Sequence, residues 1–306
     1  MAKASRNRKG SASPSQPFAG PAEIWRKFVA WAVETVDSSR SSALIRIGLV
    51  FVIWARFARA ARPWDSDFGW PIAFSLLFFV ATVARLIGYK ARISTFVTGV
   101  LAISFYYFFG MVLGHEPYTH HHTYWIGIAT LFCALTPCDK SYSLDRWLAV
   151  RRARKEGRRL PPEEGNVWGL RLIVVQLTMM YFWTAVDKLR SPSFLNGERL
   201  QGIFMSLYPH YGYWIESLWP FIVMAWIVVI LELCLAFGMP FRATRRYLVI
   251  PGLLLHGLFF ALLPVGTYSI TIALLYLAYF DPNQIHRVID ELSGVPPSRM
   301  AFKPGT

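Results

Sequence analysis

An acid and a base stand side by side at the end of a long apolar run. The run MMYFWTAV at residues 179–186 is followed at once by Asp187 and Lys188. A lysine that lies in an apolar cavity is poorly hydrated, so it can act as a base near neutral pH. A lysine at the border of a membrane segment instead extends its ammonium group to the lipid headgroups. The sequence leaves both interpretations of Lys188 open.

Two histidines and one glutamate are the other ionisable candidates in apolar surroundings. His122 closes the triplet HHH at residues 120–122 and directly precedes an apolar run, so it is better placed to face a cavity than its two neighbours. His256, in PGLLLHGLFFALL, needs a polar partner inside a helix bundle, for structure or for function. Glu232, in VVILELCLAFG, is expected to lie too deep to share a site with Lys188.

We predict no metal site. The three cysteines, at positions 133, 138 and 234, match no zinc-binding spacing, and no cluster of His, Cys or carboxylate residues stands at ligand spacing. The sequence does not determine whether Cys133 and Cys138 form a disulfide.

The composition is that of a membrane protein. Hydrophobic residues make up 54% of the 306 residues and charged residues only 16%. The net charge of +14 fits loops that contact lipid headgroups, and we expect no nucleic-acid partner. The predicted fold is all-α: an integral membrane bundle of about eight transmembrane helices with an N-terminal interfacial helix. The eight apolar stretches lie near residues 42–61, 68–88, 94–114, 122–137, 166–187, 215–239, 246–264 and 266–281.

The ends of the chain and the loops set the expected topology. Residues 1–20 read as a disordered basic cytoplasmic tail, 21–38 as an interfacial amphipathic helix and 286–306 as a cytoplasmic tail. Basic loops, above all RRARKEGRR at 151–159, predict a multi-pass protein of the cell membrane with both termini in the cytoplasm. This orientation brings Lys188, His122 and His256 to the extracytoplasmic side. A short helix near residues 197–207 is expected to cover a cavity there.

Four motifs in sequence order resemble one family. They are HTYW followed by TPCDKSYSLD, YFWTAVDKLRSPSFLNG, LELCLAFGMPF, and HGLFFALLPVGTYS. Together they look like the HTTM domain, the membrane module found in vitamin K-dependent gamma-glutamyl carboxylase. The resemblance covers about residues 40–285.

The resemblance implies a chemistry and a set of site residues. In the carboxylase, a lysine that matches Lys188 deprotonates reduced vitamin K, and two histidines match His122 and His256. We therefore expect a quinol/oxygen-dependent carboxylase-like enzyme with these three residues as catalytic groups. Reduced vitamin K or another quinol is the expected cofactor. The aromatic residues expected to bind it are Tyr124, Tyr181, Phe182 and Tyr268.

The sequence departs from the carboxylase in ways that leave an alternative. Phe194 stands where the family often has tryptophan, and the residues after about 285 cannot build the soluble domain that grips the carboxylase's substrate. We therefore expect membrane lipids as partners, together with a soluble substrate-binding protein or a peptide substrate. The alternative is a non-catalytic membrane subunit that binds a partner protein or a small lipid.

Overall fold

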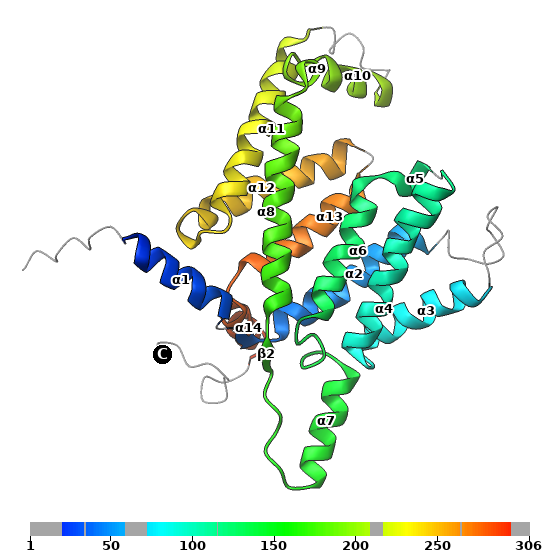
Figure 1. Ribbon diagram of the computed structural model, residues 1–306, viewed down its shortest axis with the longest axis vertical. Helices are drawn as coiled ribbons and strands as arrows, with labels where there is room; N and C mark the ends of the chain where they lie inside the picture. The colour runs from blue at the N-terminus through cyan, green and yellow to red at the C-terminus, as the bar shows by residue number, and fades with distance from the viewer. Residues whose placement is uncertain are drawn as a thin grey trace, which may run out of the picture. The chain divides into compact units, whose positions relative to one another are not determined.

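The protein is described by a computed structural model that covers residues 20–33, 35–58, 72–114, 116–208, 217–263 and 265–294. Most of these residues are helical (Figure 1). The elements are α1 (Pro21–Val33), β1 (Val36–Ser38), α2 (Arg40–Phe57), α3 (Ile72–Ile87), α4 (Ala91–Ser104), η1 (Phe105–Val112), α5 (Glu116–Thr119), α6 (His121–Ala134), α7 (Leu144–Lys155), β2 (Glu164–Asn166), α8 (Trp168–Leu189), α9 (Pro192–Leu195), α10 (Glu198–Leu207), α11 (Trp219–Gly238), α12 (Arg242–Leu262), α13 (Gly266–Leu275), η3 (Tyr276–Tyr279) and α14 (Pro282–Leu292).

A helix forms at each of the eight predicted apolar stretches. In chain order these helices are α2, α3, α4 with η1, α6, α8, α11, α12, and α13 with η3. Within the described residues, four are long and apolar enough to cross a membrane: Ala91–Val112, α8, α11 and α12. The helix α3 and the segment Gly266–Tyr279 are apolar but shorter. The prediction of a largely helical membrane protein is confirmed, with four candidate membrane-crossing helices among the described residues.

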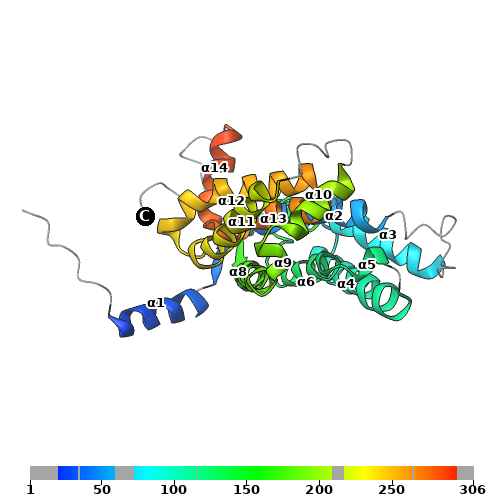
Figure 2. The same cartoon turned by 90° about the horizontal axis from the view of Figure 1, so that it is seen from above.

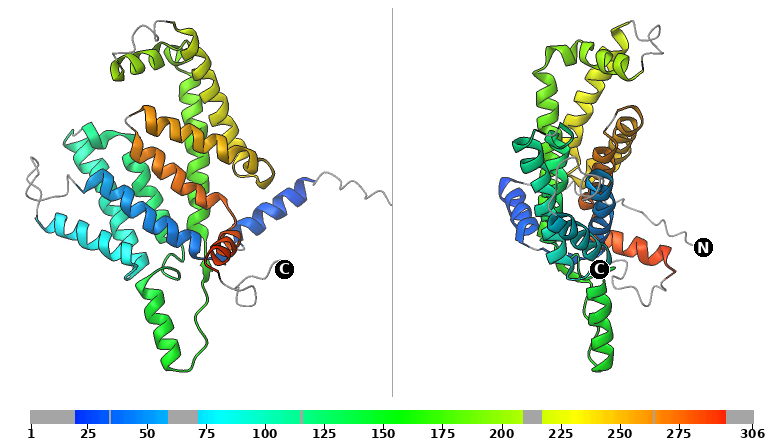
Figure 3. Two further views of the ribbon diagram at one scale, coloured as in Figure 1. Left: turned by 180° about the vertical axis from the view of Figure 1, so that it is seen from behind. Right: turned by 90° about the vertical axis from the view of Figure 1, so that its right-hand side faces the viewer.

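Six helices close a ring around the main core. In the order α2, α6, α8, α11, α12 and α13, each packs against the next, and α13 packs against α2. Figure 2 shows two layers, with α4, α6 and α8 in one and α2, α12 and α13 in the other. The side view in Figure 3 shows the same separation. The core inside the ring includes Leu177, Tyr181, Leu255 and Tyr276, so side chains of α8, α12 and η3 meet in this core.

Close packing between α6 and α8 depends on a glycine. A Cβ at Gly169 would overlap the backbone carbonyl oxygen of Phe132 and lie 2.6 Å from Cγ2 of Thr136. Gly169→Ala is therefore expected to lower the free energy of unfolding by about 3 kcal/mol, because a backbone atom cannot move aside. Thermal unfolding in detergent measures the effect. The control Gly202→Ala, on α10, has open space around its Cβ and should not destabilise the protein.

Two predicted segments contain elements that the sequence did not lead us to expect. Residues 36–38, expected in the interfacial helix, form β1, which pairs antiparallel with β2 so that Val36 lies opposite Asn166. The strand forms because β2 supplies backbone partners from a distant part of the chain. The predicted tail at 286–306 instead begins inside α14, where His286 and Asp290 are buried. Residues 1–19 and 295–306, the rest of the predicted tails, lie outside the described residues.

The helix α1 belongs to a separate compact unit that ends at Thr35. Its exposed aromatic residues Trp25, Phe28 and Trp31 follow at three-residue steps, with ring centroids 5.7 and 6.0 Å apart. This aromatic face agrees with the amphipathic pattern expected for the helix.

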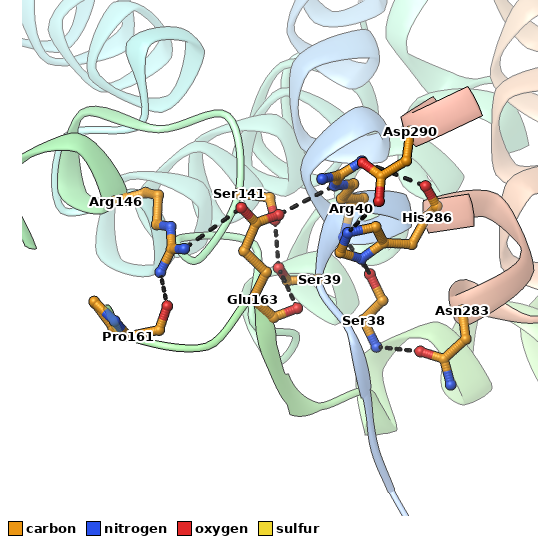
Figure 4. Close-up of polar contacts among 10 residues, drawn as sticks. All are labelled: Ser38, Ser39, Arg40, Ser141, Arg146, Pro161, Glu163, Asn283, His286 and Asp290. Carbon is orange, nitrogen blue, oxygen red and sulfur yellow. Dashed lines mark hydrogen bonds and ion pairs between the residues drawn. The ribbon is translucent and has the colours of Figure 1, made fainter. Parts of the chain in front are cut away.

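A buried polar cluster joins the start of α2 to α14 (Figure 4). Arg40 forms ion pairs with Glu163 at 3.1 Å and with Asp290 at 2.5 Å. The hydroxyl of Ser38 lies 2.7 Å from Nδ1 of His286, whose Nε2 lies 3.5 Å from Asp290. Because Nε2 faces the carboxylate, we assign the proton to Nε2, and the Ser38 hydroxyl then donates to Nδ1.

The residue types Ser38, His286 and Asp290 are also those of a hydrolytic triad. However, Ser38 is 0% exposed, His286 2% and Asp290 3%, so a substrate cannot reach the hydroxyl. The hydroxyl also contacts Nδ1, whereas hydrolases of this kind place the serine on Nε2. We therefore assign this cluster a structural role.

The cluster predicts a loss of stability in acid. Burial lowers the pKa of His286 from its ordinary value of 6.5, and the positive charge of Arg40 lowers it further. The opposing effect, which raises this pKa, comes from the carboxylates of Asp290, Glu163 and Glu164. The unfolded chain therefore binds a proton at His286 more tightly than the folded chain does. The stability that neutral His286 contributes is complete above about pH 6.5 and is lost as the pH falls below this value. His286→Gln should flatten this acid-side slope, by up to about 1.4 kcal/mol per pH unit. Unfolding of both proteins at about pH 7.5 and pH 5.5 checks this; equal slopes would contradict it.

Candidate functional site

The candidate site is built around an ion pair between α8 and α11. Nζ of Lys188 lies 2.7 and 2.8 Å from the two carboxylate oxygens of Glu232 and 3.5 Å from the carbonyl oxygen of Thr184. The Lys188 side chain therefore runs back along its own helix, as helical side chains tend to do. Side-chain exposure is 22% for Lys188 and 5% for Glu232. The ammonium group is thus held at the edge of the core by a buried carboxylate.

The second part of the site is a chain of hydrogen bonds in the core. The hydroxyl of Tyr181, on α8, lies 2.7 Å from Nε2 of His256, on α12, and 2.5 Å from the hydroxyl of Tyr276, in η3. Tyr181 and Lys188 are seven residues apart on α8, which places them on one helix face. The hydrogen-bonded chain and the ion pair therefore meet along one face of α8.

Tyr268 connects this site to His122. Its ring centroid lies 5.8 Å from that of His256 and 6.3 Å from that of His122. Its hydroxyl donates to Sδ of Met180 at 2.9 Å. His122, at the start of α6, also stacks on His120 with ring centroids 5.3 Å apart. His122 is therefore at the margin of the site, one aromatic ring away from His256.

Two of the residues expected to bind a quinol pack elsewhere. The ring of Tyr124 contacts those of Tyr106 and Tyr107, and it lines a groove of about 290 Å³ between α6 and α8. The ring of Phe182 contacts Phe237, on α11, with centroids 5.9 Å apart. The structure thus brings Tyr181 and Tyr268 to the polar group, whereas the ring contacts of Tyr124 and Phe182 lie outside it.

The segment after α8 covers the ion pair. The predicted short helix is α10, and a further turn of helix, α9, precedes it. Phe194 of α9 is buried, and its ring centroid lies 5.7 Å from Nζ of Lys188. Within the segment after α8, the residue beside Lys188 is therefore on α9, while none of the side chains of α10 is buried.

The expectation that Glu232 lies apart from Lys188 was wrong. It assumed that α11 begins at the level of the membrane at which α8 ends. The residues between these helices form α9 and α10, so the register of α11 against α8 does not follow from their ends, and Glu232 comes level with Lys188. Sequence reasoning also missed Tyr276, whose only signal was a tyrosine in an apolar helix.

No metal site is found in the part of the chain that the structure describes, where no group of three His, Cys, Asp or Glu residues is arranged to hold an ion. Cys133 and Cys138 are both buried and free.

A comparison with known protein families shows to which family the chain belongs. The family model of the HTTM domain matches residues 59–283, which is most of the chain. The chain belongs to the HTTM domain family. All the residues of the candidate site lie inside the matched HTTM region, and the apolar helices of this region identify a membrane protein. No curated protein and no solved structure matches the chain.

Proposed function

We propose that this HTTM protein is a multi-pass enzyme of the cell membrane that uses Lys188 as a base toward a reduced quinone. The resemblance to vitamin K-dependent gamma-glutamyl carboxylase implies this chemistry. The observation that carries the proposal is the contact of Nζ with both oxygens of Glu232, at 2.7 and 2.8 Å. A headgroup anchor would extend away from the bundle, whereas this ammonium group lies against a buried carboxylate.

The side chains near the ion pair suit a ring that carries hydroxyl groups. Nδ1 of His256 is buried and has no hydrogen-bond partner among the described residues. It can bond to a hydroxyl group of a hydroquinone, with Tyr268 beside it to contact the ring. When bound, a reduced quinone supplies the reaction with oxygen that drives the carboxylation of glutamate.

Glu232 gives Lys188 a route to its neutral, basic form. A proton that moves from Nζ to a carboxylate oxygen leaves two neutral groups, and this avoids the desolvation of two charges in the apolar core. Neutral Lys188 then accepts a proton from a hydroxyl group held by Nδ1 of His256. Tyr181 orients the imidazole through its hydrogen bond to Nε2. His122, one ring further out, stabilises negative charge at the margin of the site.

The proposed topology has eight crossings and both termini in the cytoplasm. The eight apolar helices supply the crossings, with α2, α3, α6 and α13 tilted or shielded by their neighbours because they are short or charged. α1 lies in the membrane interface by virtue of its exposed aromatic face. A soluble partner or a glutamate-rich peptide provides the substrate.

A non-catalytic subunit is the second candidate. Its supporting observation is the same ion pair, because Lys188 and Glu232 neutralise each other and join α8 to α11 without a ligand. In that case the pair serves the packing of the bundle, and the polar core binds a lipid or stabilises a docking surface for a partner protein.

The two candidates differ in whether quinol is consumed. The purified protein in lipid vesicles is given reduced vitamin K or a short-chain hydroquinone, and oxygen uptake and quinone epoxide are measured against protein-free vesicles. Labelled carbon dioxide and a glutamate-rich peptide are then added to test carboxylation. Oxygen-dependent epoxide formation supports the enzyme. If wild-type protein neither binds nor oxidises any quinol, the enzyme is rejected and the subunit is retained.

A further inference from the structure

The helix α7 stands apart from the other helices. Figures 1 and 3 show it projecting beyond the end of the bundle at which α8 begins. It has 12 residues, and Ala153 is the buried one. Isolated helices of this length are marginally stable in water. A surface that covers one face of α7 would stabilise it.

One face of α7 combines cations with apolar side chains. Trp147, Val150, Arg151, Arg154 and Lys155 recur at steps of three and four residues, so they share this face. They line a hollow of about 400 Å³. The guanidinium group of Arg151 lies 5.3 Å from the ring of Trp147. Such a face fits anionic oxygens that are attached to an apolar body.

The position of α7 in the fold indicates which anions reach it. The carboxylate of Asp145, in its first turn, accepts hydrogen bonds from the backbone N–H groups of Lys90 and Ala91, where α4 begins. The chain after α7 leads through β2 directly into α8, and both α4 with η1 and α8 are candidate membrane-crossing helices. The first turn of α7 is therefore attached where α4 begins, which is the level of the lipid headgroups, and residues 156–163 connect its other end to β2.

We propose that the α7 face formed by Trp147, Val150, Arg151, Arg154 and Lys155 binds the phosphate groups of anionic lipids. The three cations contact the phosphates, and Trp147 and Val150 contact the glycerol and the first part of the acyl chains. An acidic segment of a protein would match the cations but would leave Trp147, which is 54% exposed, without an apolar partner. This inference does not depend on the proposed enzymatic function.

Hydrogen exchange of the full-length protein tests the proposal. The protein is reconstituted in bilayers of phosphatidylcholine alone and of phosphatidylcholine with phosphatidylglycerol, and exchange of the α7 amides is compared. Anionic lipid should slow this exchange by about tenfold or more, an effect that high salt weakens. Exchange of the α8 amides, which should be the same in all samples, verifies that each variant is folded.

Matched variants separate the face from its total charge. Replacing Arg151, Arg154 and Lys155 by glutamine should abolish the slowing. Replacing Arg152, Arg158 and Arg159 by glutamine removes the same amount of charge from outside this face. This variant should keep most of the slowing of exchange. Three outcomes would overturn the proposal: equal exchange in the two bilayers, the same response from both triple variants, or slowing that inorganic phosphate or polyglutamate produces in phosphatidylcholine alone.

Discussion

Arginine in place of Lys188 is expected to keep the protein folded and to abolish oxygen-dependent oxidation of the quinol. Arginine can pair with both oxygens of Glu232, so the ion pair between α8 and α11 survives. Its guanidinium group does not lose a proton in proteins, so it cannot act as a base. Because a positioned base contributes about 10²- to 10⁴-fold, the rate of epoxide formation should fall by at least about a hundredfold.

The comparison of Lys188→Arg with Lys188→Met distinguishes a base from an anchor. Both variants should lose activity, but only Lys188→Met should also lose stability, because it leaves Glu232 without its partner. Initial rates with reduced quinone and thermal unfolding in the same lipid measure the two effects. An active Lys188→Arg protein would show that the side chain serves as a positive charge and not as a base.

Glu232→Gln is expected to destabilise the protein strongly. Removal of one partner from a buried ion pair leaves an uncompensated charge and costs about 3–5 kcal/mol. Because Glu232 is 5% and Lys188 22% exposed at the side chain, we expect the lower end of that range, about 3 kcal/mol. Lys188 can recover part of the loss by turning toward the headgroups.

A double-mutant cycle isolates the ion pair from the packing around it. Lys188→Met combined with Glu232→Gln removes both charges, and the double variant should be more stable than Glu232→Gln alone. Unfolding of the four proteins in one detergent gives the coupling free energy. Strictly additive effects of the two substitutions would mean that Lys188 and Glu232 do not interact in the folded protein.

The helices were predictable because their signal is local. Each of the eight apolar stretches carries its own hydrophobic run, and each forms a helix. The short helix after α8 was also predictable, because the sequence of residues 189–214 is too polar to cross a membrane and too apolar to remain a free loop.

Contacts between distant segments were not predictable in the same way. The pairing of Lys188 with Glu232 depends on the register between two helices, which hydropathy does not determine. The contact of Ser38 with His286 and the pairing of β1 with β2 join segments that lie far apart in the sequence. The apolar pattern of α14 offered no reason to expect that His286 and Asp290 would be buried against the start of α2.

The polar cluster between β1 and α14 also restricts how the chain can be threaded through a bilayer. Ser38 precedes all the apolar helices and His286 follows them, yet their side chains are hydrogen-bonded. A path that starts and finishes on one side of a barrier must cross it an even number of times. We therefore expect an even number of membrane crossings between Ser38 and His286, and reporter tags fused just outside these two points should be accessible from the same compartment.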